Sequence, residues 1–134
     1  MRIGSLTNAL QFSSSGLAAE RFRMDTISSN IANANTVAKP GEDGYHRRSV
    51  VLNATDNGVQ IQSIMEDRER PLLTKIDRNN PMADKVTGVV TMSNVDPTME
   101  MVDMIGASRA YEANIAAFNT VKGMITSALQ IGKA

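Results

Sequence analysis

The sequence predicts a mainly α-helical protein with a small β insert, in which long N- and C-terminal helices pair as a coiled coil and a short β-rich or extended segment lies between them. Three observations support this fold class. Apolar residues recur at heptad spacing near both ends of the chain. Turn-forming residue pairs are concentrated in the middle. Three Phe, two Tyr and no Trp leave few large core residues, which favours helices that pack through small and flexible side chains.

The first helix is expected at residues 1 to about 34, within an N-terminal segment at 1–35. Counted in heptads, its a positions are all apolar: Ile3, Leu10, Leu17, Met24 and Ile31. Its d positions are Leu6, Ser13, Glu20, Ile27 and Ala34, of which three are apolar. A stripe maintained over nearly five heptads is typical of a helix that pairs with another helix.

The middle segment, at 36–95, is expected to hold loops and a β-hairpin. The pair Asn57-Gly58 is typical of a tight hairpin turn, and apolar residues alternate with period two on both sides of it. Weaker strand candidates follow at Leu72–Ile76 and Val86–Met92. We therefore expect a small β-rich insert between the helices.

The second helix is expected at residues 96 to about 131, within a C-terminal segment at 96–134. Asp96 is suited to be its N-cap and Pro97 its first residue, while Gly132 marks its end.

The stripe of the second helix follows the same heptad spacing. Its members are Met104, Ala107, Tyr111, Asn114, Phe118, Val121, Ile125 and Ala128. Only Asn114 is polar, and a buried polar residue in such a seam can fix register and partner choice.

Composition excludes several function classes. The chain has 14 basic and 14 acidic residues, so no net charge favours nucleic acid or anionic lipid. It has no Cys, which excludes disulfides, thiolate catalysis and Cys-ligated zinc. No stretch approaches the roughly 18 apolar residues of a membrane span. The N-terminus lacks the apolar core of a cleavable signal, so any export is expected to leave it intact.

Catalytic and ligand-binding patterns are also missing. The single His, His46, is expected to be a solvent-facing residue near the start of a strand. The carboxylates at 66–70 have Arg residues beside them and are expected to form a solvated charged turn. The oxygen-rich run at 77–80 lacks the Gly and Glu that complete a calcium loop. We therefore expect no enzyme activity, metal site, cofactor or small-molecule substrate.

The end of the first helix is unusually rich in Asn. The run Ser-Ser-Asn-Ile-Ala-Asn-Ala-Asn-Thr at 28–36 places amides among apolar residues, where exposed Asn would only weaken a helix. A buried amide needs hydrogen-bond partners. We therefore expect Asn30 and Asn33 to cap the helix or to bind a neighbouring chain, the alternative being a simple frayed end.

The same run resembles the N-terminal signature of the bacterial flagellar rod, hook and hook-associated proteins. A second block resembles the C-terminal helix of the proximal rod subunits of that family. It comprises Asn-Val-Asp at 94–96, Glu-Met-Val-Asp-Met-Ile at 100–105, Ala-Ser-Arg-Ala-Tyr-Glu-Ala-Asn-Ile at 107–115 and Asn-Thr-Val-Lys at 119–122. The short chain length agrees with this resemblance.

The resemblance implies a structural subunit of the flagellar basal-body rod. Such a subunit is exported through the flagellar type III apparatus without cleavage and polymerises in the periplasm with copies of itself, other proximal and distal rod proteins and the basal-body adaptor. Its terminal helices form a tube that transmits torque. The expected assembly interface comprises Leu10, Leu17, Met24, Ile27, Asn30, Ile31, Asn33, Met104, Tyr111, Asn114, Phe118, Val121 and Ile125.

Two other classes of function remain open from the residues alone. A helical adaptor or secretion chaperone would bind a partner helix in a groove lined by some of the nine Met. An enzyme acting on cell-wall glycan would need a pair of carboxylates with separated pKa values, and the sequence offers no such pair.

Overall fold

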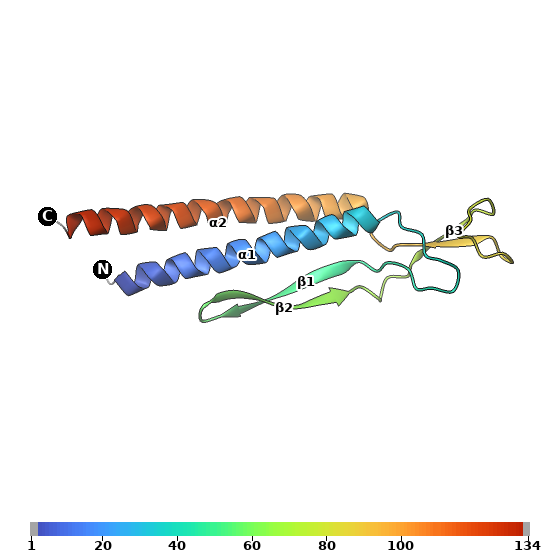
Figure 1. The fold of residues 1–134 in the computed structure, drawn as a ribbon, viewed down its shortest axis with the longest axis horizontal. Helices are drawn as coiled ribbons and strands as arrows, with labels where there is room; N and C mark the ends of the chain where they lie inside the picture. Colours follow the sequence, from blue (N-terminus) through green and yellow to red (C-terminus); the bar gives the residue numbers. More distant parts are fainter. Residues whose placement is uncertain (1–2, 133–134) are drawn as a thin grey trace.

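The computed structural model describes residues 3–132 and shows an elongated molecule of two long helices and two small sheets (Figure 1). The elements are α1 Ile3–Asn33, β1 Arg48–Thr55, β2 Gly58–Glu66, β3 Leu73–Ile76, β4 Val89–Met92 and α2 Pro97–Ile131. Strands β1 and β2 form one antiparallel pair, and β3 and β4 form another. The predicted fold class is confirmed. Residues 1 and 2 of the first predicted helix lie outside the described residues.

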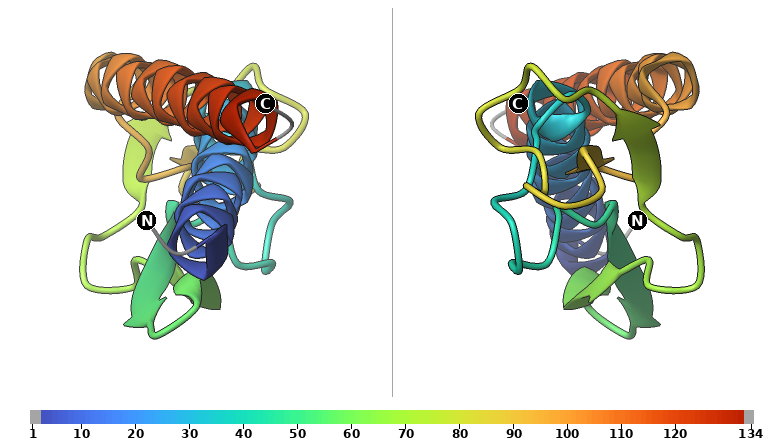
Figure 2. Two further views of the ribbon diagram at one scale, coloured as in Figure 1. Left: turned by 90° about the vertical axis from the view of Figure 1, so that its left-hand side faces the viewer. Right: turned by 90° about the vertical axis from the view of Figure 1, so that its right-hand side faces the viewer.

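Helix α1 is the middle layer of the molecule. Helix α2 runs antiparallel along one side of it, so that the first turn of α1 and the last turn of α2 lie at the same end (Figure 1). The hairpin of β1 and β2 lies along the opposite side of α1, as the end-on views also show (Figure 2). The β3–β4 pair extends beyond the other end of the helices. One helix face therefore contacts α2 and another contacts the hairpin.

Helix α2 begins as its sequence predicts. Asp96 has an extended backbone and its carboxylate accepts hydrogen bonds from the amides of Thr98, at 2.9 Å, and Met99, at 3.5 Å. Pro97 follows at the first position, where its missing N–H leaves no bond unmade. The helix ends at the predicted Gly132, which keeps a right-handed conformation with φ of −73°.

The hairpin turn is displaced by one residue from the predicted Asn57-Gly58. Thr55 pairs with Gly58, so Asp56 and Asn57 form the turn and Gly58 opens β2. The φ of Gly58 is 121°, and a Cβ built on it would lie 2.1 Å from Ser15 Oγ. The backbone amide of Val59 donates to the same Oγ at 3.0 Å. Gly58 is therefore required because the hairpin approaches α1 closely here.

The second strand pair is shorter than predicted. β3 begins at Leu73, one residue later than predicted. β4 begins at Val89, because residues 84–88 form a turn before it. The Asp84 carboxylate accepts hydrogen bonds from the amides of Val86, at 2.8 Å, and Thr87, at 2.9 Å. Hydrogen bonding from Thr87, then from Val86, lowers the pKa of Asp84. The Asp84 side chain holds residues 86 and 87 in this turn, so the predicted strand at 86–92 begins only at residue 89.

The core of the subunit is thin. Its buried apolar residues are mostly small: Leu6, Ala19, Ile27, Ala34, Ala83, Val90, Val95 and Ala107. Large apolar side chains remain exposed along β2, β3 and α2. A free monomer with so much exposed apolar surface is a subunit suited to association.

Candidate functional site

A buried polar cluster connects the end of α1 to the start of α2. We call this cluster, formed by Asn30, Tyr45, Arg47, Asn94 and Glu100, the polar junction. The side chains of Asn30 and Glu100 have no exposed surface. Such groups are stable inside a protein only when their hydrogen bonds are complete.

All four hydrogen-bonding positions of the Asn30 amide are used inside the subunit. Its Nδ2 donates to the carbonyl of Arg48 at 2.7 Å and to Glu100 Oε2 at 2.9 Å. Its Oδ1 accepts from the amide of Arg48 at 3.0 Å and from the hydroxyl of Tyr45 at 3.0 Å. Asn30 thus joins α1, the segment before β1, and α2.

The buried carboxylate of Glu100 pairs with Arg47. Arg47 Nε donates to Glu100 Oε1, and its Nη2 donates to Asp103 Oδ2 at 2.9 Å. Burial lowers the pKa of Arg47, but its hydrogen bond and charge interaction with Glu100, and then the charge of Asp103, outweigh burial and raise the pKa overall. The guanidinium therefore ties the segment before β1 to the first turns of α2.

Asn94 completes the junction from the segment before α2. Its Oδ1 accepts from the amide of Arg47 at 2.7 Å, and its Nδ2 donates to the carbonyls of Asp67, at 2.8 Å, and Arg70, at 3.0 Å. A single side chain thus links the chain before β1, the chain after β2 and the approach to α2.

His46 differs from its prediction. It lies before β1, and its side chain is only 11% exposed. Its Nδ1 lies 3.2 Å from the carbonyl of Asp67, and its Nε2 lies 3.1 Å from Asp43 Oδ1. The hydrogen bond from His46 lowers the pKa of Asp43. The prediction failed because the segment that follows β2 folds back onto His46, and the carbonyl of Asp67, 21 residues away in the sequence, lies against its ring.

The structure places Asn30, one of the predicted interface residues, inside the single subunit. With no exposed surface and a fully used amide, Asn30 is an internal residue. Asn33 binds locally, donating to the carbonyl of Ser29 at 2.8 Å and accepting from the hydroxyl of Thr36 at 3.3 Å. Helix capping, the first alternative drawn from the sequence, therefore describes Asn33.

The other predicted interface residues lie on the less exposed face of each helix. Ile27 is buried, and half-buried residues are Leu10, Leu17, Met24, Ile31, Met104, Tyr111, Asn114, Phe118, Val121 and Ile125. In the single subunit this face of α2 follows the seam with α1. Contacts of these residues with another copy remain a prediction.

Gly16 and Asn114 meet across the seam. A Cβ built on Gly16 would lie 3.0 Å from Asn114 Nδ2, 3.2 Å from its Cγ and 3.3 Å from its Oδ1. The helices approach closely at this point because Gly16 has no side chain. The contact also defines the antiparallel register of the two helices.

Replacing Gly16 with Ala is expected to destabilise the wild-type subunit but to stabilise an Asn114→Ala variant by about 1 kcal/mol. In the wild type the new methyl group meets the Asn114 amide, whereas in the variant only the higher helix propensity of Ala remains. Urea unfolding of all four combinations measures the coupling. Equal effects of Gly16→Ala in both backgrounds would contradict the contact.

Each helix also has an outer face turned away from the seam. The outer face of α1 comprises Ser14, Ala18, Arg21 and Asp25, and the outer face of α2 comprises Val102, Ile105, Arg109, Glu112 and Ala116. All are exposed, and Val102 and Ile105 expose 59% and 55% of their surface. These residues could not be predicted from the heptad stripe, because they lie outside it. Apolar residues outside the stripe were the available signal.

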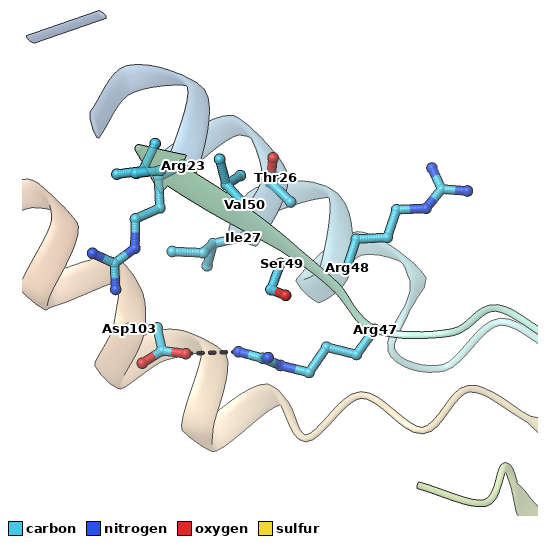
Figure 3. Close-up of a pocket in the computed structure, with 9 residues that line it drawn as sticks. Arg23, Thr26, Ile27, Arg47, Arg48, Ser49, Val50 and Asp103 are labelled. Carbon is cyan, nitrogen blue, oxygen red and sulfur yellow. Dashed lines mark hydrogen bonds and ion pairs between the residues drawn. The ribbon is translucent and has the colours of Figure 1, made fainter. Parts of the chain in front are cut away.

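An open pocket of about 250 Å³ lies between α1, β1 and α2. Figure 3 shows the side chains that line it, with the guanidinium of Arg47 pointing toward the carboxylate of Asp103. Within residues 3–132, no group of three or more His, Asp or Glu residues could hold a metal ion, and no helix is long and apolar enough to cross a membrane. Of the side chains that line the pocket, Arg47 and Asp103 form an ion pair with each other, whereas Arg23 and Arg48 pair with Glu20 and Glu66 outside it.

Comparisons with known proteins agree with these observations. Residues 10–38 match the family model described as "Flagella basal body rod protein", and residues 86–131 match "Flagellar basal body rod FlgEFG protein C-terminal". The chain is 37% identical to "Flagellar basal-body rod protein FlgC" of Bacillus subtilis, covering 94% of this chain and 97% of the relative. The FlgC protein of Salmonella typhimurium is 36% identical, and the match covers 96% of this chain and 99% of the relative. The FlgC protein of Aquifex aeolicus is 41% identical, and the match covers 86% of this chain and 88% of the relative.

Proposed function

The chain belongs to the family of flagellar basal-body rod proteins FlgC and is a structural subunit of the flagellar rod, and on this premise we propose that its two terminal helices polymerise into the tube that transmits torque. The observation that carries this proposal is the exposure of two large apolar residues on the outer face of α2. Val102 and Ile105 are more than half exposed on a helix that already has a covered seam face. Burying this second face needs another chain.

The family membership places the chain in the flagellar basal body, where it assembles with other basal-body components. We propose that its neighbours are copies of itself, other proximal and distal rod proteins and the basal-body adaptor. We also propose that the flagellar type III apparatus exports it into the periplasm without cleavage. Leu6 is buried in the folded subunit, so removal of the start of α1 would take away part of the core.

Removing the gene for this chain from its source bacterium tests the proposed function. We expect the deletion strain to lack complete rods and to be non-motile, and the full chain to restore both. Purified basal bodies should then contain the chain. A helical adaptor or secretion chaperone would instead form a discrete soluble oligomer and would be absent from purified basal bodies. Complete rods in the deletion strain would contradict the proposal.

Assembly is also expected to order the free ends of the helices. The turn of the hairpin reaches α1 at Ser15 and near Phe12, and the first turns of α1 extend beyond it (Figure 1). In the free subunit, amides at residues 4–11 and 122–131 should therefore exchange at least about tenfold faster than those at residues 26–30 and 100–107, since fewer contacts oppose local opening. Hydrogen exchange with mass spectrometry measures this. Equal protection along α1 would contradict it.

A further inference from the structure

Within residues 3–132, four charged residues on the outer faces of the helices have no partner inside the subunit. Arg21 and Asp25 lie on the outer face of α1, and Arg109 and Glu112 lie on the outer face of α2. All four are exposed, and within residues 3–132 none of them makes a hydrogen bond or an ion pair. Each face thus presents one base followed, about one helical turn later, by one acid.

The two charged pairs lie on different faces of the molecule, each turned away from the seam between α1 and α2. The contact between Gly16 and Asn114 marks the inner side of each helix. At about 100° per residue, Arg21 and Asp25 are roughly half a turn from Gly16, and Arg109 and Glu112 are roughly half a turn from Asn114. One copy can therefore offer its α1 face to one neighbour and its α2 face to another.

A single alignment makes these faces complementary. Place α2 of a second copy antiparallel against the outer face of α1, shifted by about four residues, or about 6 Å, from the register inside the subunit. Asp25 then lies opposite Arg109, and Arg21 lies opposite Glu112. In the same alignment Ala18 lies opposite Ala116, so two small side chains let the helices approach closely.

We propose that the outer face of α1 binds the outer face of α2 of a second copy through the ion pairs Asp25–Arg109 and Arg21–Glu112. This inference rests on the proposed function and specifies how copies meet. The contact joins two different surfaces, and such a heterologous contact that does not close on itself builds a helical assembly.

The charges also select the register. Without the axial shift, Arg21 of one copy would face Arg109 of the next, and like charges would repel. With the shift, both pairs are attractive and the apolar residues Val102 and Ile105 are covered beside them. The ion pairs therefore define the axial step between copies, while the apolar residues supply most of the affinity.

Charge exchange in the source bacterium tests the pairing. Asp25→Arg alone and Arg109→Glu alone should each reduce the number of complete rods at least tenfold, because each creates a like-charge contact. The double variant should recover to within twofold of the wild type. The melting temperature of each purified variant should change by less than about 2 °C, since none of these residues has a partner in the free subunit.

Crosslinking provides an independent test, because the chain has no Cys of its own. A chain carrying Asp25→Cys and Arg109→Cys should give a ladder of disulfide-linked multimers in oxidised basal bodies. A chain with Asp25→Cys and Ser127→Cys, whose second site lies farther along α2, should give none. If the wild type does not enter rods, the proposed function fails and this inference with it. If it does, but the charge exchange gives no recovery and the ladder is absent, only the pairing is overturned.

Discussion

Arg47→Met is expected to destabilise the free subunit by about 3 kcal/mol, because it leaves the buried Glu100 carboxylate without its cation. Glu100 has no exposed surface, and Arg47 is the cation that binds it. The value lies at the lower end of the range for a broken buried ion pair, since the Arg47 side chain is 24% exposed and water can reach the site. Urea unfolding monitored by circular dichroism measures the change.

A second substitution separates loss of charge balance from loss of packing. Adding Glu100→Gln to Arg47→Met should recover about 2 kcal/mol, because Gln carries no charge and still accepts the hydrogen bond from Asn30. Arg68→Met is the matched control. Arg68 also has two acidic partners, but it is 66% exposed, and its loss should cost less than about 1 kcal/mol. Equal costs for Arg47→Met and Arg68→Met would contradict the importance of the junction.

The helices and the hairpin could be predicted because their signals are local. The heptad spacing needs only neighbouring residues, and the cap at Asp96 needs only the next three. The turn was displaced by one residue because its position depends on Ser15, which is distant in sequence from Gly58. Local turn preference could not include this contact.

The polar junction could be predicted only in part. The Asn-rich run indicated that an amide needed a partner, but the partners of Asn30 come from Tyr45, Arg48 and Glu100. These residues meet only after α2 has returned antiparallel to α1 and the hairpin has packed against it. Burial of Glu100 could not be predicted from the sequence either, because an acidic residue in the first turn of a helix is usually explained by the helix dipole.

Ile105→Asp is expected to abolish rod assembly while leaving the subunit folded. Ile105 is 55% exposed on the outer face of α2, so the substitution should change the free energy of unfolding by no more than about 0.5 kcal/mol. In a rod, each contact would lose up to about 2 kcal/mol of apolar burial and would also have to bury a carboxylate.

The loss would recur at every contact along the rod, which is why the assembly should be far more sensitive than the monomer. Ile76→Asp is the matched control, because Ile76 is also apolar and 72% exposed but lies on β3, away from the paired helices. Electron microscopy of basal bodies and swimming assays give the result. Complete rods in the Ile105→Asp strain, or their loss in the Ile76→Asp strain alone, would show that the outer face of α2 is not the surface that joins one subunit to the next.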